Sequence, residues 1–220
     1  MPEASGDFVA KMEDVLEVYH RPYSPERPVI CLDETNRQLI AETRVSIPAE
    51  PGKSKKVDYE YRRNGVGNLF MIFEPLQATR YVKTTERRTG IDFAHCIRDI
   101  VDLHYPAAEK IVMVMDNLNT HKIGSLYEAF APDEARRLAE KLEIHYTPKH
   151  GSWLNMAEIE IGVLSQQCLS KRIPTLKQME KEATAWAETR NLAKRTVNWQ
   201  FTTEDARIKL KRLYQQIDEK

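Results

Sequence analysis

The stretch that decides the fold is "VMVMDNLNTH", which runs from Val112 to His121. Its first half is apolar on both faces of a strand, a pattern typical of the buried centre of a sheet. Its second half begins with Asp116, the first charged residue of the stretch. Aspartate followed by asparagine is good turn and helix-cap chemistry. A carboxylate at the mouth of a strand is also a place for a metal ligand, and that interpretation requires partner residues elsewhere in the chain.

A second aspartate follows an apolar strand earlier in the chain. In "PVICLDE", from Pro28 to Glu34, the residues before Asp33 are apolar on both faces. If the two strands are neighbours, both carboxylates reach one crevice at the strand ends, where open α/β sheets place their ligands. Hard divalent cations prefer oxygen ligands. A third carboxylate would therefore make a two-metal site credible.

Candidates for the third carboxylate lie in "GSWLNMAEIEIG", from Gly151 to Gly162. On a helix, this stretch has Glu158 at one edge of its apolar face and Glu160 at the other edge. Helical geometry alone leaves the choice between them open. Each acid also has a structural explanation, with the aspartates as strand-end turn residues and Glu158 as a solvated helix acid.

Hydrophobic periodicity around these motifs predicts the other elements of the fold. The expected strands are 28–34, 67–76, 79–85, 110–115 and 143–148. The expected helices are 7–19, 90–105, 132–142, 153–169 with Ser152 as its cap, 175–192 and 202–217. The glycine pair Gly65 and Gly67 lacks a third glycine and a following helix, so it indicates a hairpin and not a dinucleotide site. The element order predicts a mixed α/β domain.

Composition excludes several classes of protein. A chain of 220 residues with 41% apolar residues can bury one sizeable core. The cysteines are odd in number and far apart, which disfavours a disulfide framework and a zinc site, and no histidine pair has helical metal-ligand spacing. No signal peptide or membrane span is evident. We therefore expect a soluble cytoplasmic protein with no membrane partner.

Positive charge is concentrated in two segments although the net charge is zero. Residues 51–88 contain nine Lys/Arg and four Asp/Glu, and residues 170–220 contain twelve and seven. Segregated charge of this kind can present an anion-binding face, although solvated surface is the alternative. The candidates for contacts with a DNA backbone are Lys53, Lys55, Lys56, Arg62, Arg63, Lys209, Lys211 and Arg212.

Three blocks, "CLDE", "MDNLNTH" and "TPKHGSWLNMAEIE", resemble in order and residue type the signature blocks of the mariner transposase superfamily, specifically its bacterial insertion-sequence branch. The resemblance extends over Phe8 to Ile217. It implies an RNase H-like, retroviral-integrase-like mixed sheet flanked by helices, with a C-terminal helical tail. It also implies a catalytic triad of Asp33, Asp116 and Glu158. Glu158 is selected because Leu154–Glu158 matches the family's Leu-Asn-x-x-Glu block, which leaves Glu160 as a neighbour.

The family resemblance also implies a reaction and its partners. The three acids would hold two Mg²⁺ or Mn²⁺ ions for DNA strand cleavage and strand transfer, with targets at TA dinucleotides. The expected partners are double-stranded DNA of transposon ends and target, a second copy of the chain in the DNA complex, and a separately encoded helix-turn-helix portion. A bacterial transposase of this kind would be associated with the nucleoid.

Several polar and aromatic residues near the triad have two interpretations. The candidates for positioning a phosphate or a metal-bound water are Asn117, Asn119, His121 and Asn155. Capping of the next helix is the alternative for the first three. Trp153 is a candidate to stack on a DNA base, and an aromatic staple beside a helix start is the alternative.

The chain departs from the family pattern in three respects, of which the first is that the 41 residues between Asp116 and Glu158 exceed the spacing usual in eukaryotic members. Met156 and Ala157 stand where many relatives have a proline and an aliphatic residue, and residues 1–28 are too few for the family's helix-turn-helix modules. We therefore expect a connector helix and linker over 1–28, the catalytic domain over 29–170 and a helical extension over 171–220. We expect such a chain to be the catalytic half of a transposase from a split or frameshifted reading frame. The alternative is an inactive or truncated remnant that only binds DNA or a partner.

Overall fold

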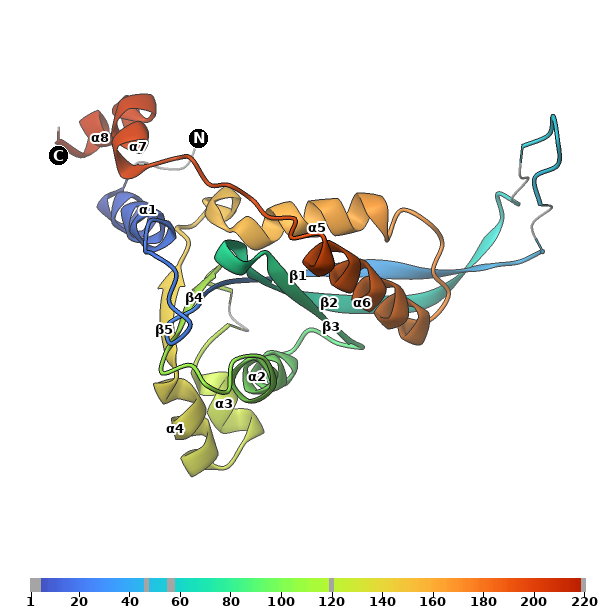
Figure 1. Cartoon of the computed structure of the whole chain (residues 1–220), viewed down its shortest axis with the longest axis horizontal. Helices are drawn as coiled ribbons and strands as arrows, with labels where there is room; N and C mark the ends of the chain where they lie inside the picture. Colours follow the sequence, from blue (N-terminus) through green and yellow to red (C-terminus); the bar gives the residue numbers. More distant parts are fainter. Residues whose placement is uncertain (1–4, 46–47, 55–57, 119–120, 219–220) are drawn as a thin grey trace.

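A mixed five-stranded sheet forms the centre of the computed structural model, which describes residues 5–45, 48–54, 58–118 and 121–218 (Figure 1). The strand order is β3-β2-β1-β4-β5. The pairs β1–β2 and β2–β3 are antiparallel, whereas β1–β4 and β4–β5 are parallel. The strands are β1 (Val29–Glu42), β2 (Tyr61–Glu74), β3 (Thr79–Thr85), β4 (Ile111–Met115) and β5 (Leu142–Tyr146).

Helices cover both faces of the sheet, with α2, α3 and α4 on one side and α1, α5 and α6 on the other (Figure 1). Alternate residues of β1 enter the two layers, so that Ile30 packs with the first group and Cys31 with the second. The helices are α1 (Gly6–Tyr19), α2 (Gly90–Asp99), α3 (Gly124–Ala129), α4 (Pro132–Glu140), α5 (Met156–Gln167), α6 (Leu176–Leu192), α7 (Thr203–Lys209) and α8 (Lys211–Asp218). The expected α/β class, with a mixed sheet flanked by helices and a helical C-terminal part, is confirmed.

The strands β1 and β2 continue well past the predicted segments and project from the sheet as a long arm (Figure 1). The predicted hairpin at Gly65 and Gly67 is wrong, because both glycines lie inside β2. Gly65 has a φ of 95° and lies near the register shift between Gln38 and Ile40. A β-bulge with a left-handed residue requires glycine at such a point, which is why a turn-like sequence occurs within a strand.

Helix α5 begins later than the sequence predicts. Ser152 starts a 3₁₀ turn, Ser152–Leu154, and Asn155 caps α5 by accepting a hydrogen bond from the amide of Ala157 at 3.1 Å. Asn155 replaces Ser152 as the cap because its amide group also donates to the Leu32 carbonyl of β1 at 2.8 Å.

The two ends of the chain pack onto the same core. Met12, Val15 and Leu16 of α1 are fully buried, and Arg207 of α7 pairs with Glu13 of α1 at 2.9 Å. The last predicted helix is divided at Leu210 into α7 and α8, and α3 is an element that the sequence did not predict. The division of the chain at residues 28 and 170 stays a prediction. Within the described ranges no helix combines the length and apolar character needed to cross a membrane.

Candidate functional site

The aspartates Asp33 and Asp116 lie side by side in the register of the sheet. The parallel pairing of β1 with β4 ends at Cys31 and Val114, and both aspartates follow that pair by two residues. Asp33 is only 9% exposed and lies inside β1, so its alternative interpretation as a strand-end turn residue is wrong. Asp116 directly follows the last residue of β4. Strand β4 therefore ends next to Asp33, whereas β1 continues beyond it.

Helix α5 contributes Glu158 to the same region. Odd-numbered residues at the start of β1 face the layer that contains α5, which gives Asp33 and α5 a common side of the sheet. Glu158 lies in the first turn of α5 and is exposed. Its negative charge acts on Asp33, as does that of Asp116. The structure thus brings the three acids of the predicted triad into electrostatic range.

Glu160 has a different environment, although it is two residues from Glu158. Its side chain is 1% exposed, lies 3.0 Å from the Nε of fully buried Arg80 in an ion pair, and accepts a hydrogen bond from Nη2 of Arg190 at 2.9 Å. These arginines belong to β3 and α6. Glu160 is therefore committed to a buried ion-pair network, which favours Glu158 as the third acid of the candidate site.

The Asp33 carboxyl has a pKa raised from 3.8 to about 7. Burial is the main cause, because it penalises the charged form. The amide of Glu34 donates to Oδ1 of Asp33 at 2.7 Å and opposes this increase, while Asp116 and Glu158 add to it. The site therefore contains negative charge that a bound cation would stabilise. Within the described parts of the chain, however, no three His, Cys, Asp or Glu side chains stand as a ready-made metal-binding group.

His121 holds Asp116 in place. Its Nδ1 lies 2.6 Å from Oδ1 of Asp116, and its Nε2 contacts the carboxylate of Glu34. The ring is fully buried; burial lowers its pKa, but the two carboxylates raise the pKa to about 9 overall. A pKa of about 9 favours the charged ring at neutral pH, with Nδ1 hydrogen-bonded to Asp116 and Nε2 in ion-pair contact with Glu34. The interpretation of His121 as a helix cap is wrong, because Ile123 occupies the N-cap position of α3.

Glu34 is the residue that the sequence reasoning missed. Its side chain is 1% exposed, faces the layer opposite to Asp33, and lies 3.5 Å from Nη1 of Arg88 at the nearest oxygen. The one available signal was an acid at an inward position of a central strand. Its partner His121 is distant in sequence, and nothing in the local pattern links the two.

The remaining polar candidates differ in their placement. Asn155 is fully buried and connects the start of α5 to Leu32, the residue before Asp33. Asn117 is exposed after β4. Asn119 lies outside the described residues. The structure thus joins Asn155 to the backbone beside the triad, and Asn117 stays a prediction.

The basic candidates fall into two groups at opposite ends of the molecule (Figure 1). Lys53, Arg62 and Arg63 are exposed on the arm or its tip, with Lys53 3.2 Å from Glu50. The second group, in α7 and α8, is also exposed and contains Lys209, Lys211 and Arg212. Lys55 and Lys56 lie outside the described residues.

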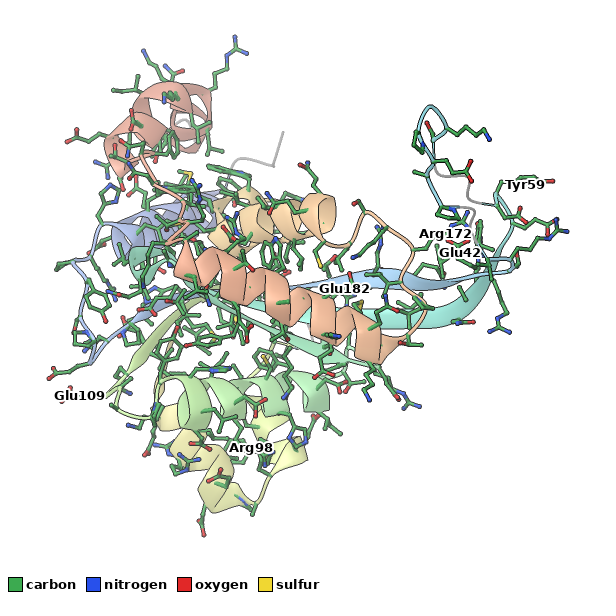
Figure 2. All side chains as sticks on the ribbon, turned by 45° about the vertical axis from the view of Figure 1, so that its right-hand side comes forward. Glu42, Tyr59, Arg98, Glu109, Arg172 and Glu182 are labelled. Atoms are coloured by element: carbon green, nitrogen blue, oxygen red, sulfur yellow. The ribbon has the colours of Figure 1, made fainter. Side chains whose placement is uncertain are left out.

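Arg172 supports the arm from the segment that precedes α6. Figure 2 shows Arg172 beside Glu42, with Tyr59 farther out. Nη1 of Arg172 donates to Glu42 at 2.6 Å and to the Asp58 carbonyl at 2.8 Å. This contact ties the segment before α6 to the outer end of the β1–β2 pairing.

Comparisons with known proteins agree with this geometry. A family model described as "DDE superfamily endonuclease" matches residues 28–180. The crystal structure of the Mos1 strand transfer complex has a TM-score of 0.56 at 13% identity, over 83% of this chain and 53% of that one. The Mos1 mariner paired end complex with Mn has a TM-score of 0.54 at 13% identity, over 85% and 56%. No match was found among curated proteins.

The structural similarity confirms the expected RNase H-like fold. The chain spans about half the length of these Mos1 chains. The family match includes both strand-borne aspartates and the α5 glutamates, since all of them lie within residues 28–180. Assignment to the bacterial insertion-sequence branch stays a prediction.

Proposed function

The chain belongs to the DDE superfamily endonucleases, and from that premise we propose that it is a transposase catalytic domain that cuts DNA strands with divalent metal ions. The observation that carries this proposal is the placement of Asp33 and Asp116 two residues beyond the Cys31–Val114 pair of β1 and β4, with Glu158 in the first turn of α5, all within the region that matches the family. We assign catalysis and metal binding to Asp33, Asp116 and Glu158. Strand transfer and targets at TA dinucleotides belong to the same proposal through the family resemblance.

The donor set suits two hard cations such as Mg²⁺ or Mn²⁺. All three side chains offer carboxylate oxygens, the donor type that these ions prefer. Bound divalent ions would supply Lewis-acid activation of a water or 3′-hydroxyl and stabilisation of the leaving oxygen. Burial is the main cause of the raised pKa of Asp33, and the negative charges of Asp116 and Glu158, which add to it, are the charges that such ions would offset. Because Mg²⁺ sites are commonly completed by substrate phosphates, we propose that DNA completes the convergence of the three carboxylates.

Other residues of the chain would hold these acids in place. His121 is hydrogen-bonded to Asp116 through Nδ1 and forms an ion pair with Glu34 through Nε2, and this arrangement would fix the direction of the Asp116 carboxylate. Asn155 joins the first turn of α5 to the Leu32 carbonyl. Helix α5 therefore presents its glutamate from a start that is tied to the strand bearing Asp33.

Metal-dependent nicking of supercoiled plasmid tests the proposal. The wild-type chain should nick the plasmid with Mg²⁺ or Mn²⁺ and not with EDTA. Asp116→Asn should abolish nicking, because one charged ligand is lost with little change in volume. Asp133→Asn, an exposed substitution of the same kind at the start of α4, is the matched control and should retain activity. Nicking that survives Asp116→Asn would refute the assignment, and absence of nicking by the wild type would favour the inactive remnant.

We propose the partners that accompany this function in the family. They are double-stranded DNA of transposon ends and target, a second copy of the chain in the DNA complex, and a separately encoded helix-turn-helix portion. Sedimentation of the chain with and without duplex DNA tests the second copy. A complex whose total mass at saturation equals one chain on one duplex would argue against it.

A further inference from the structure

An exposed aromatic and basic surface lies beside the start of α5. Trp153 is 44% exposed in the 3₁₀ turn that precedes α5. Its ring meets the ring of Phe201 edge-on, with centroids 5.8 Å apart and planes at 68°. Nζ of Lys209 lies 5.3 Å from the centre of the same Phe201 ring. We call Trp153, Phe201 and Lys209 the Trp153 platform.

The platform is connected to the triad through the chain. Trp153 is two residues before Asn155, whose side chain bonds to the Leu32 carbonyl next to Asp33. It is five residues before Glu158, the acid of the first turn of α5. The carbonyl of Leu154, between them, accepts from the Tyr19 hydroxyl of α1 at 2.6 Å. The turn that carries Trp153 is thus fixed on both sides, at the edge of the proposed catalytic centre.

Packing alone does not account for Trp153. A tryptophan nearby, Trp199, serves as a staple: it is partly buried, its ring contacts Tyr19 at 5.2 Å, and its indole N–H donates to the Phe201 carbonyl at 2.8 Å. Trp153 has the opposite character. Among the described residues its indole N–H has no hydrogen-bond acceptor, and close to half of the residue's surface is open to solvent.

The charge around the platform suits a nucleic acid. The Lys209 side chain is 65% exposed, with the carboxylate of Asp205 3.9 Å away at the margin of ion-pair distance. Lys211 and Arg212 follow and are exposed. Surfaces that bind unpaired bases combine aromatic rings with nearby cations that contact the backbone. Lys209 was a candidate for DNA contact from its charge alone, and the structure joins it to an aromatic pair beside α5.

We propose that Trp153 stacks on an unpaired base of the bound DNA, next to the position where the strand is cut, while Lys209 contacts a backbone phosphate. The location of the DNA rests on the proposed function. Stacking itself requires no metal and no catalysis, so its test is independent of cleavage. The ligand class is a single-stranded nucleobase, because the π-face of every base can stack on an indole.

The test is a binding measurement in EDTA with forked duplexes. One fork has a single-stranded arm of adenines and the other has abasic sites at the same positions. The wild type should prefer the adenine fork. Trp153→Ala should weaken binding to the adenine fork by about 5- to 150-fold, the range for loss of one stacked base, with little effect on the abasic fork. Equal weakening on both forks, no weakening, or a wild type without preference would overturn the inference.

Three further variants separate stacking from other roles. Trp153→Leu retains an apolar contact with Phe201 and should lose base-dependent binding as Trp153→Ala does, which covers the case in which the alanine variant fails to fold. Lys209→Gln should weaken both forks alike, because it removes a phosphate contact. Trp186→Ala, a partly buried tryptophan on α6 whose indole N–H bonds to Gln167, is the matched control and should leave the preference unchanged.

Cleavage distinguishes this inference from the proposed function. If the wild type prefers the adenine fork in a Trp153-dependent manner but does not nick plasmid, the stacking surface stands and the catalytic proposal fails. If the wild type nicks plasmid and Trp153→Ala has no base-dependent defect, the catalytic proposal stands and the stacking inference fails.

Discussion

At the scale of single residues, the ionised carboxylate of Asp33 lowers the folding stability of the metal-free protein. Its folded-state pKa of about 7 lies above the ordinary 3.8, mainly through burial and then through Asp116 and Glu158. The folded state therefore favours the protonated form, and ionisation destabilises it. The penalty is absent below the unfolded pKa, grows as pH rises between the two values, and is complete above about 7.

Asp33→Asn should therefore stabilise the metal-free protein at pH 8 while abolishing nicking. The gain should be on the order of 1–3 kcal/mol, since one unit of pKa corresponds to about 1.4 kcal/mol and relaxation reduces the full value. Near pH 3.5 the variant and the wild type should unfold alike. Urea denaturation in EDTA at both pH values measures the effect. A variant less stable than the wild type at pH 8 would contradict it.

The contact between His121 and Glu34 gives a second prediction. Glu34→Gln retains an acceptor for the His121 ring but removes a buried charge that the ring neutralises. The Asp116 carboxylate is then held less firmly, and nicking should fall by about 10- to 100-fold, as for other groups that orient a metal ligand. Plasmid nicking measured against Mn²⁺ concentration tests this. A variant with wild-type activity and metal dependence would show that the contact does not position Asp116.

The acids of the candidate site could be proposed from the sequence, whereas the contacts that distinguish Glu158 from Glu160 could not. Asp33 and Asp116 were recognisable because each follows an apolar run. Glu158 and Glu160 were indistinguishable by periodicity, since both border the apolar face. Their difference depends on Arg80 and on the fold that buries it, and such long-range pairing leaves no local pattern.

At the scale of elements, α5 is fixed at two places that have different chemistry. Asn155 ties its start to β1, and Glu160 ties its next turn to Arg80 of β3 and Arg190 of α6. Asn191 strengthens the second tie, because its side chain bonds to both the backbone and the guanidinium of Arg80. The helix that bears Glu158 is thus attached to the central strand β1 and to the edge strand β3.

Glu160→Gln should therefore reduce folding stability, whereas Glu158→Gln should abolish nicking. Glu160→Gln leaves Arg80 buried without its counter-charge and should cost about 3–5 kcal/mol of folding free energy, the usual effect of breaking a buried ion pair. Glu158→Gln alters an exposed acid and should leave stability nearly unchanged while abolishing nicking. Urea denaturation and plasmid nicking on the two variants test this. If Glu158→Gln were the destabilised variant, or Glu160→Gln the stable variant that loses nicking, the roles assigned to the two glutamates would have to be exchanged.

Element types were more predictable than element ends. The strands with apolar residues on both faces were found, since burial from both sides dictates that pattern. The arm was not, because its outer part is exposed and polar, and only pairing between β1 and β2 makes it a strand. The start of α5 was misplaced for the same reason, since the Leu32 carbonyl that selects Asn155 belongs to another element.

At the scale of the whole molecule, the net charge of zero hides two separate basic groups. One is on the arm and the other on α7 and α8, and the sheet and its helices lie between them (Figure 1). The sequence predicted both groups from charge segregation but could not place them relative to one another. Their separation implies that one duplex contacts both groups only if it extends along the molecule.

The salt dependence of DNA binding should therefore divide into two additive parts. Neutralising the arm group (Lys53, Arg62 and Arg63 to Gln) should reduce the slope of log affinity against log salt by at most about 3, and neutralising the other group (Lys209, Lys211 and Arg212 to Gln) should do the same. On a long duplex the two reductions should add, because distant sites are independent. On a duplex too short to reach both ends, the slope of the combined variant should fall by less than the sum of the two separate reductions. Fluorescence anisotropy over a salt series measures each slope. An unchanged slope in either variant would remove that group from the DNA interface, and equal losses on long and short duplexes would show that DNA does not extend between the two ends.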